Sequence, residues 1–438
     1  MARGGVNRPR VEHFRLPNGL EVLLAPEPTS PTASVWVWYR VGSKNEHPGI
    51  TGASHWVEHM LFQGSPRYGK GEVDRAVVEV GGALNAFTSY DFTAYYSTVP
   101  RAHLAVPLDI EADRLTRALI TDREVDRERT VVLSEREGNE NWPEFRASEE
   151  LYELAFRRHP YRWDALGYRR DIESMNGEHL REYYHRFYGP RNAVLVIAGG
   201  FEPATVRTTV RRRFGRLPAV GEDPRVADVE PPPRGERRST LRGPGTTPFL
   251  DVAFRAPSVF DPSAAATMML DTVLGGESRL FGGGSIWGRA REHPSSRLYR
   301  SLVDPGLAVR ATSEWQARVH PSLFEVHAQA SAGVTLDRLE DAVHSTLRRL
   351  SRDGPTAAEV EEARVRVRRG AGLSYEGSTR TGFRLGLFAT LRSTAFEDEL
   401  YRALLKVRPP AIRDVARALF REEARVVVRY EPSSAGAA

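Results

Sequence analysis

The sequence predicts an α+β fold built from two similar halves, each a mixed sheet covered by helices. A strand-like segment rich in β-branched and aromatic residues occurs in each half, at residues 33–41 and at 250–256. A polar stretch and then a helical pattern follow each of these segments. Between the halves, residues 219–238 are rich in proline and charge, which indicates an extended linker.

The first half contains a second strand–helix pair. Residues 191–200 have the composition of a buried strand that enters a tight turn, and residues 202–214 have a helical pattern. Repeated strand-then-helix segments favour mixed sheets with helices packed on one face. We therefore expect an N-terminal domain at residues 1–218, followed by the linker and a C-terminal domain at 239–438.

The second half repeats this layout with different chemistry. Its strand is followed by a helix start signal at residues 261–263 and by a helical run at 264–274. At the place where the first half has histidine and glutamate, the second half has Met268, Met269, Leu270 and Asp271. This layout predicts a duplicated unit in which only the first copy keeps metal ligands.

The composition narrows the classes of function. The chain has 438 residues and no cysteine, which excludes disulfides and thiolate metal sites, so that a metal would be held by His, Asp or Glu. No apolar run approaches the roughly 20 residues that cross a bilayer, and no apolar segment follows the basic N-terminus. We therefore expect a cytoplasmic protein without a membrane partner.

The charge balance is slightly basic. Lys and Arg total 62 against 57 Asp and Glu, giving a formal net charge of +5, which would be compatible with a nucleic-acid partner. However, the basic residues are interleaved with acids, as at residues 127–129 and 361–364, and scattered charge is typical of solvated helix faces. We expect no nucleic-acid partner.

The chemically informative cluster is His55-Trp56-Val57-Glu58-His59. Two histidines four residues apart lie on the same face of a helix, so that both imidazoles can reach one metal ion. Glu58 lies close enough to contact a metal-bound water without binding the metal. The pattern H-x-x-E-H is the inverted form of a zinc peptidase motif. A stacked His pair can also be a half-buried polar patch without a metal.

A catalytic zinc site needs a third protein ligand. The best candidate is Glu135, in a strongly helical segment. Glu128 lies seven residues earlier, on the same face two turns away, where it could orient a ligand or the water. In such a site, zinc would acidify its water and polarise a carbonyl, while Glu58 would act as general base and return the proton to the leaving amine.

With these motifs the sequence resembles the pitrilysin family of zinc peptidases, which includes insulin-degrading enzyme and mitochondrial processing peptidase. That family pairs H-x-x-E-H with a more distant ligating glutamate, and here Glu135 follows His59 by 76 residues (135 − 59). The resemblance implies a clam-like chamber, with His55, His59 and Glu135 as zinc ligands. It also implies that Glu58 is the catalytic base and Glu128 an accessory catalytic glutamate.

Other matching stretches are residues 81–93, 159–161 and 188–193. In the family, the segment equivalent to Asn85, Ala86 and Phe87 belongs to a sheet edge that binds substrate as an added strand. The alternative for Asn85 is a turn residue before a strand. A glycine-rich loop at 275–288 resembles one in the non-catalytic subunit of the processing peptidase, although it could also be a solvent loop.

One departure from the family pattern concerns the second half. Active members carry an Arg and a Tyr that hold the substrate, and here these positions correspond to Val303 and Val309. Their replacement suggests that a second, related subunit supplies them, as in heterodimeric relatives, so we expect a related subunit as partner, with a homodimer as the alternative assembly. The sequence thus predicts a zinc metalloendopeptidase for peptides or unfolded segments. The alternative is a catalytically weak or inactive structural subunit of a peptidase-like complex.

Overall fold

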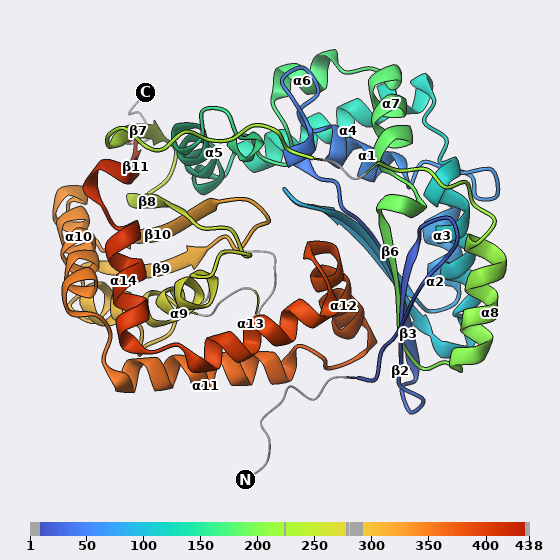
Figure 1. Cartoon of the computed structure of the whole chain (residues 1–438). Helices are drawn as coiled ribbons and strands as arrows, with labels where there is room; N and C mark the ends of the chain where they lie inside the picture. Colours follow the sequence, from blue (N-terminus) through green and yellow to red (C-terminus); the bar gives the residue numbers. More distant parts are fainter. Residues whose placement is uncertain (1–8, 223–224, 277–279, 281–291, 434–438) are drawn as a thin grey trace, which may run out of the picture. The chain divides into compact units, whose positions relative to one another are not determined.

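A computed structural model describes residues 9–222, 225–276, 280 and 292–433 (Figure 1). The chain divides into two compact units that interleave its halves. Unit 1 consists of Met1–Gly138, Trp163–Asp228 and Ser374–Phe396, and unit 2 of Asn139–Arg162, Val229–Leu373 and Glu397–Ala438. Among the described residues, no helix is both long and apolar enough to span a bilayer.

Unit 1 contains a six-stranded mixed sheet with the order β1-β2-β6-β3-β5-β4. The strands are β1 (Glu12–Arg15), β2 (Glu21–Pro26), β3 (Thr32–Tyr39), β4 (Ala83–Thr88), β5 (Thr93–Pro100) and β6 (Ala193–Gly199). Only β2 and β6 pair in parallel. The helices are α1 (Ala53–Met60), α2 (Glu72–Glu79), α3 (Ala105–Arg117), α4 (Asp122–Glu140), α6 (Arg169–Ser174), α7 (Gly177–Phe187), α8 (Pro203–Phe214) and α12 (Ser378–Leu391).

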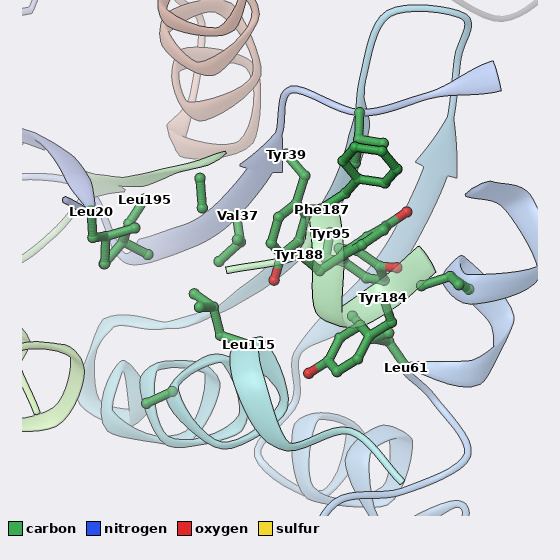
Figure 2. Close-up of a cluster of buried hydrophobic side chains, with 14 of the residues drawn as sticks. Leu20, Val37, Tyr39, Leu61, Tyr95, Leu115, Tyr184, Phe187, Tyr188 and Leu195 are labelled. Carbon is green, nitrogen blue, oxygen red and sulfur yellow. The ribbon is translucent and has the colours of Figure 1, made fainter. Parts of the chain in front are cut away.

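The central strand β3 is buried on both faces of this sheet. Val35, Val37 and Tyr39 belong to a core that also contains apolar residues of α1, α3, α7 and α8. Figure 2 shows part of this core, with Tyr39 and Val37 of β3 near Tyr95 and Tyr188. Because side chains alternate along a strand, the intervening tryptophans of β3 point to the opposite face.

That opposite face is covered by α12, which comes from the C-terminal half of the chain (Figure 1). The helix approaches closely because it has glycine at two positions one turn apart. A Cβ on Gly382 would lie 2.3 Å from Trp36 Cδ1, and one on Gly386 would lie 1.9 Å from Trp38 Nε1. The prediction that helices cover one face of the sheet is therefore wrong for unit 1.

Unit 2 contains a five-stranded mixed sheet with the order β7-β11-β8-β10-β9. The strands are β7 (Arg237–Gly243), β8 (Phe249–Ala256), β9 (Ala308–Trp315), β10 (Ser322–Ala330) and β11 (Arg425–Pro432). Only β7 and β11 pair in parallel. The helices that lie wholly or mostly in this unit are α5 (Pro143–Ala155), α9 (Ala264–Leu274), α10 (Leu336–Asp353), α11 (Ala357–Leu373), α13 (Thr394–Lys406) and α14 (Pro409–Leu419).

The second sheet also has helices on both faces. Phe324 of β10 packs against Phe420 at the end of α14, whereas its neighbour Glu325 accepts a hydrogen bond from Tyr152 of α5. Adjacent strand residues point to opposite faces, so α5 and α14 lie on opposite sides of the sheet. The α5 helix comes from the N-terminal half, so each half contributes one helix to the sheet formed mainly by the other half.

Candidate metal centre

The helix α1 is fixed at its first turn by a buried carboxylate. Glu46 accepts hydrogen bonds from the backbone amides of Gly52 at 2.7 Å and Ser54 at 2.8 Å. Gly52 has a left-handed backbone (φ 91°), and a Cβ there would lie 2.6 Å from the carbonyl oxygen of Leu166. A side chain at position 52 is therefore disfavoured both by the left-handed backbone and by the carbonyl of Leu166.

The structure brings His55, His59 and Glu135 together. The Nε2 atoms of His55 and His59 lie 3.3 Å apart. Glu135, on α4, places Oε2 3.3 Å from His59 Nε2 and Oε1 3.6 Å from His55 Nε2. Within the described parts of the chain, these three residues are the one group of His, Asp and Glu side chains whose atoms converge in this way.

These separations match the geometry of a zinc site. A tetrahedral zinc ion with bonds of about 2.0–2.1 Å has ligand atoms about 3.3–3.4 Å apart. The two histidine nitrogens lie 3.3 Å apart, and the Glu135 oxygens lie 3.3 Å (Oε2) from His59 and 3.6 Å (Oε1) from His55, at or close to this value. The two imidazole nitrogens and one carboxylate also form a donor set that zinc commonly uses. The residues therefore fit a zinc ion with one open position.

Glu128 lies behind His59. Its Oε1 is 2.9 Å from His59 Nδ1, and its Oε2 accepts a hydrogen bond of 2.8 Å from the side-chain amide of Gln63. A proton on His59 Nδ1 that is donated to Glu128 leaves the Nε2 lone pair for a metal. Glu128 thus contacts His59, one of the candidate ligands, whereas Gln63 was missed because nothing in its local pattern indicates a partner on α4.

Charge in the metal-free centre is unevenly distributed. Burial and the neighbouring His59 lower the pKa of His55 to about 4. Burial disfavours charge on His59 as well, but hydrogen bonds to Glu128 and Glu135 outweigh it and raise the pKa to about 9. The hydrogen bond from His59 lowers the pKa of Glu135. A metal ion that uses His59 Nε2 must therefore displace a proton, so that binding will weaken in acid.

Glu58 is buried beside the two histidines. Burial raises its pKa to about 7, although a hydrogen bond of 2.6 Å from Thr88 Oγ1 to Glu58 Oε2 opposes this. A carboxylate whose pKa lies near neutrality suits general-base work. The sequence pointed to Glu58 but not to Thr88, because β4 and α1 meet only in the folded chain.

The three predicted substrate-binding residues lie in β4, which is an edge strand. Asn85 is exposed and its Oδ1 accepts a hydrogen bond of 2.8 Å from the amide of Ala86. Phe87 is buried against Trp36 and Trp38. Asn85 is therefore a strand residue, and the alternative of a turn before the strand is wrong.

The two positions at which we expected the family's Arg and Tyr, Val303 and Val309, lie in unit 2. Val303 ends a short π-helical turn, Tyr299–Val303, and Val309 is an exposed residue of β9. Both are aliphatic, and neither can donate a hydrogen bond to a substrate through its side chain. Most of the glycine-rich loop at 275–288 lies outside the described residues.

A tandem α+β architecture with an H-x-x-E-H helix in its first unit defines the class of the inverted-motif zinc peptidases and their homologues. Comparison with known families agrees. Residues 21–167 match the Insulinase (Peptidase family M16) domain, and residues 174–366 match the Peptidase M16 inactive domain. The chain belongs to the peptidase M16 family.

Relatives extend over nearly the full chain. It is 27% identical over 421 residues to the uncharacterized zinc protease YmxG of Bacillus subtilis, covering 94% of this chain and 96% of that protein. It is 27% identical over 388 residues to the mitochondrial-processing peptidase subunit beta of Lentinula edodes, covering 86% and 80%. The crystal structure of a protease from Helicobacter pylori superposes with a TM-score of 0.89 at 24% identity, covering 97% and 100%.

Proposed function

We propose that this chain is a zinc-dependent endopeptidase that hydrolyses peptides or unfolded segments. The observation that carries the proposal is the convergence of His55, His59 and Glu135 at 3.3, 3.3 and 3.6 Å, beside a buried glutamate. The names of relatives as zinc proteases support the same reading.

Each residue of the candidate site has a separate role in the proposed reaction. A zinc ion held by the three ligands would supply Lewis-acid chemistry, polarising a carbonyl and acidifying water. Glu58 takes the proton of the attacking water and delivers it to the leaving amine. Glu128, held by Gln63, orients His59.

The edge strand β4 suits an extended substrate. Backbone pairing at an open sheet edge accepts many sequences, as a peptidase for unfolded segments requires. The amide of Ala86 donates its hydrogen bond to the Asn85 side chain. A peptide strand that pairs with Ala86 would displace this contact and leave the Asn85 amide group available to the substrate.

A related subunit completes the site in this proposal. Val303 and Val309 cannot stabilise an oxyanion or bind a substrate carbonyl, and a second copy carries the same two valines, so the Arg and the Tyr would come from a related subunit. The relative named as subunit beta of a mitochondrial processing peptidase is by its name part of a larger assembly, which favours the heterodimer.

The test combines metal analysis with cleavage of a quenched peptide. We expect stoichiometric zinc in the wild-type chain and in Glu58→Gln. With a related subunit added, we expect cleavage by the wild-type chain and none by the variant. Glu137→Gln is the matched control, because Glu137 lies on the same helix as Glu135 but its side chain is 66% exposed. Purified chain that takes up no zinc contradicts the proposal.

A second outcome would identify the alternative function. Zinc without cleavage, and with cleavage restored by adding a related subunit, establishes a divided active site. Zinc without cleavage under both conditions favours a structural subunit of a peptidase-like complex. The valines at positions 303 and 309, where an Arg and a Tyr are expected, are the observation that favours this second function.

A further inference from the structure

Thr88, the last residue of edge strand β4, contacts Glu58 directly. Its Oγ1 donates a hydrogen bond of 2.6 Å to Glu58 Oε2, and both side chains are buried. The other hydroxyl nearby belongs to Thr93, 3.5 Å away, which itself donates to the carbonyl oxygen of Val41 at 3.0 Å. The proton of Thr88 therefore has Glu58 as its acceptor.

Because of this bond, the two carboxylate oxygens of Glu58 have different surroundings. Oε2 is tied to Thr88, whereas Oε1 has no hydrogen-bond partner within the described part of the chain. Rotation of the carboxyl group would break this short, buried hydrogen bond, and a bond of this kind is stronger when its acceptor is ionised. Oε1 is thus the oxygen left to exchange a proton.

Unit 2 shows what the same kind of contact looks like without catalysis. Asp271 of α9 bonds to the edge strand β9, accepting from Ser313 Oγ at 2.6 Å and from the amide of Trp315 at 3.2 Å. There both oxygens of the carboxylate are engaged by one strand. In both units, therefore, an acidic side chain connects a helix to an edge strand. In unit 1 this acid is Glu58, and one of its two oxygens is left without a bond to the strand.

We propose that Thr88 is a positioning residue for the base Glu58. It holds the carboxylate in one orientation and ties it to the strand whose edge receives the peptide, an inference that rests on the proposed peptidase function. Since Thr88 acts through Glu58, its loss should reduce the rate of the chemical step more than the binding of substrate or zinc.

The experiment compares Thr88→Val, which keeps the shape and removes the hydroxyl, with Thr88→Ser, which keeps the hydroxyl. We expect Thr88→Val to lower kcat by about 10–100-fold, in the range of other supporting residues around metal sites, with KM and zinc content close to wild type. Thr88→Ser should restore most of kcat. Thr98→Val is the matched control, because it removes a hydroxyl from neighbouring β5, which bonds to Ser34 and Thr379 instead.

A structural readout is independent of activity. In crystals of the metal-free chain, Glu58 should leave its wild-type position in Thr88→Val and keep it in Thr88→Ser. Wild-type kcat in Thr88→Val, or loss of zinc that Thr88→Ser does not rescue, overturns the proposal. If the wild-type chain cleaves no peptide either alone or with a related subunit, the peptidase function fails, whereas an unmoved Glu58 in Thr88→Val overturns the positioning role on its own.

Discussion

The two units share one strand plan and differ in the helix that carries the chemistry. The order β2-β6-β3-β5-β4 in unit 1 corresponds strand for strand to β7-β11-β8-β10-β9 in unit 2, with the parallel pair in the same place. In unit 1, α1 carries two of the three candidate ligands, His55 and His59, whereas α9 of unit 2 is buried along its whole length and carries methionines there. The same architecture thus forms with an apolar helix, which indicates that the fold does not need the metal centre.

The largest expected effect follows from this contrast. We expect His59→Ala to reduce zinc from stoichiometric to background content and to abolish peptide cleavage, while the metal-free chain keeps its secondary structure. Zinc analysis and circular dichroism measure both. His103→Ala, at an exposed histidine of unit 1, is the control and should keep zinc. Global unfolding of His59→Ala would show that unit 1, unlike unit 2, depends on its centre for folding.

The second largest effect concerns the helix on the far face of the first sheet. We expect Gly386→Ala to destabilise the chain by about 3 kcal/mol or more, because the added Cβ would lie 1.9 Å from Trp38 Nε1. Gly372→Ala in α11 is the matched control. Nothing lies within 4 Å of its Cβ position, so it should stabilise by up to about 1 kcal/mol. Urea unfolding measures both, and equal effects would show that α12 is not tightly packed on β3.

The sequence predicted the local parts of both units well. The helix-borne His pair follows from a spacing of four residues, and the run at residues 264–274 is a helix with those bounds, α9. The family and the α+β class are confirmed. The sequence named Glu135 as the third candidate ligand from its helical segment, and the family resemblance strengthened this pairing, since no local pattern connects α1 with α4.

What the sequence did not reveal are contacts between distant segments. The local pattern of residues 378–391 predicts a helix but does not say which sheet it covers. The role of Gly382 and Gly386, which allow the helix to approach Trp36 and Trp38, is visible only in the folded chain. Thr88 and Gln63 were missed for the same reason. The domain boundaries at 218 and 239 stay a prediction about the two homologous halves, which the compact units interleave.

A smaller effect separates the two acids that tie a helix to an edge strand. We expect Asp271→Asn to cost about 1–3 kcal/mol, because an amide replaces one of two buried acceptors that Ser313 and Trp315 use. Glu58→Gln should cost less, since only one of its oxygens is engaged. Asp341→Asn, at an exposed position of α10, is the control. A larger loss in Glu58→Gln would reverse the assignment of structural and catalytic acids.

The units also differ in how acid should affect them. In unit 1, burial raises the pKa of Glu46 to about 8, although the amides at the start of α1 oppose it. In unit 2, burial would raise the pKa of Glu359, but hydrogen bonds from Arg297 and Thr356 outweigh it and lower the pKa to about 2. A carboxyl group whose pKa is raised by folding stabilises the folded chain more as the pH falls towards the pKa that the group has in the unfolded chain. A carboxyl group whose pKa is lowered by folding stabilises the folded chain above its unfolded-state pKa, and this contribution is lost in acid.

The smallest expected effect is therefore an acid-dependent one in unit 2. Glu359→Gln should cost about 1 kcal/mol near pH 7 and nothing additional as the pH falls from about 5 to 3, whereas the wild-type chain loses that contribution over the same interval. Urea unfolding of the metal-free chain at both pH values measures the difference in slope. Glu361→Gln is the matched control on the same helix, because its pairs with Arg364 and Arg368 are exposed and such pairs contribute little. Parallel pH dependence in wild type and Glu359→Gln would show that the Arg297 contact does not distinguish the folded from the unfolded chain, and the contrast between the acids of the two units would then rest on Glu46 alone.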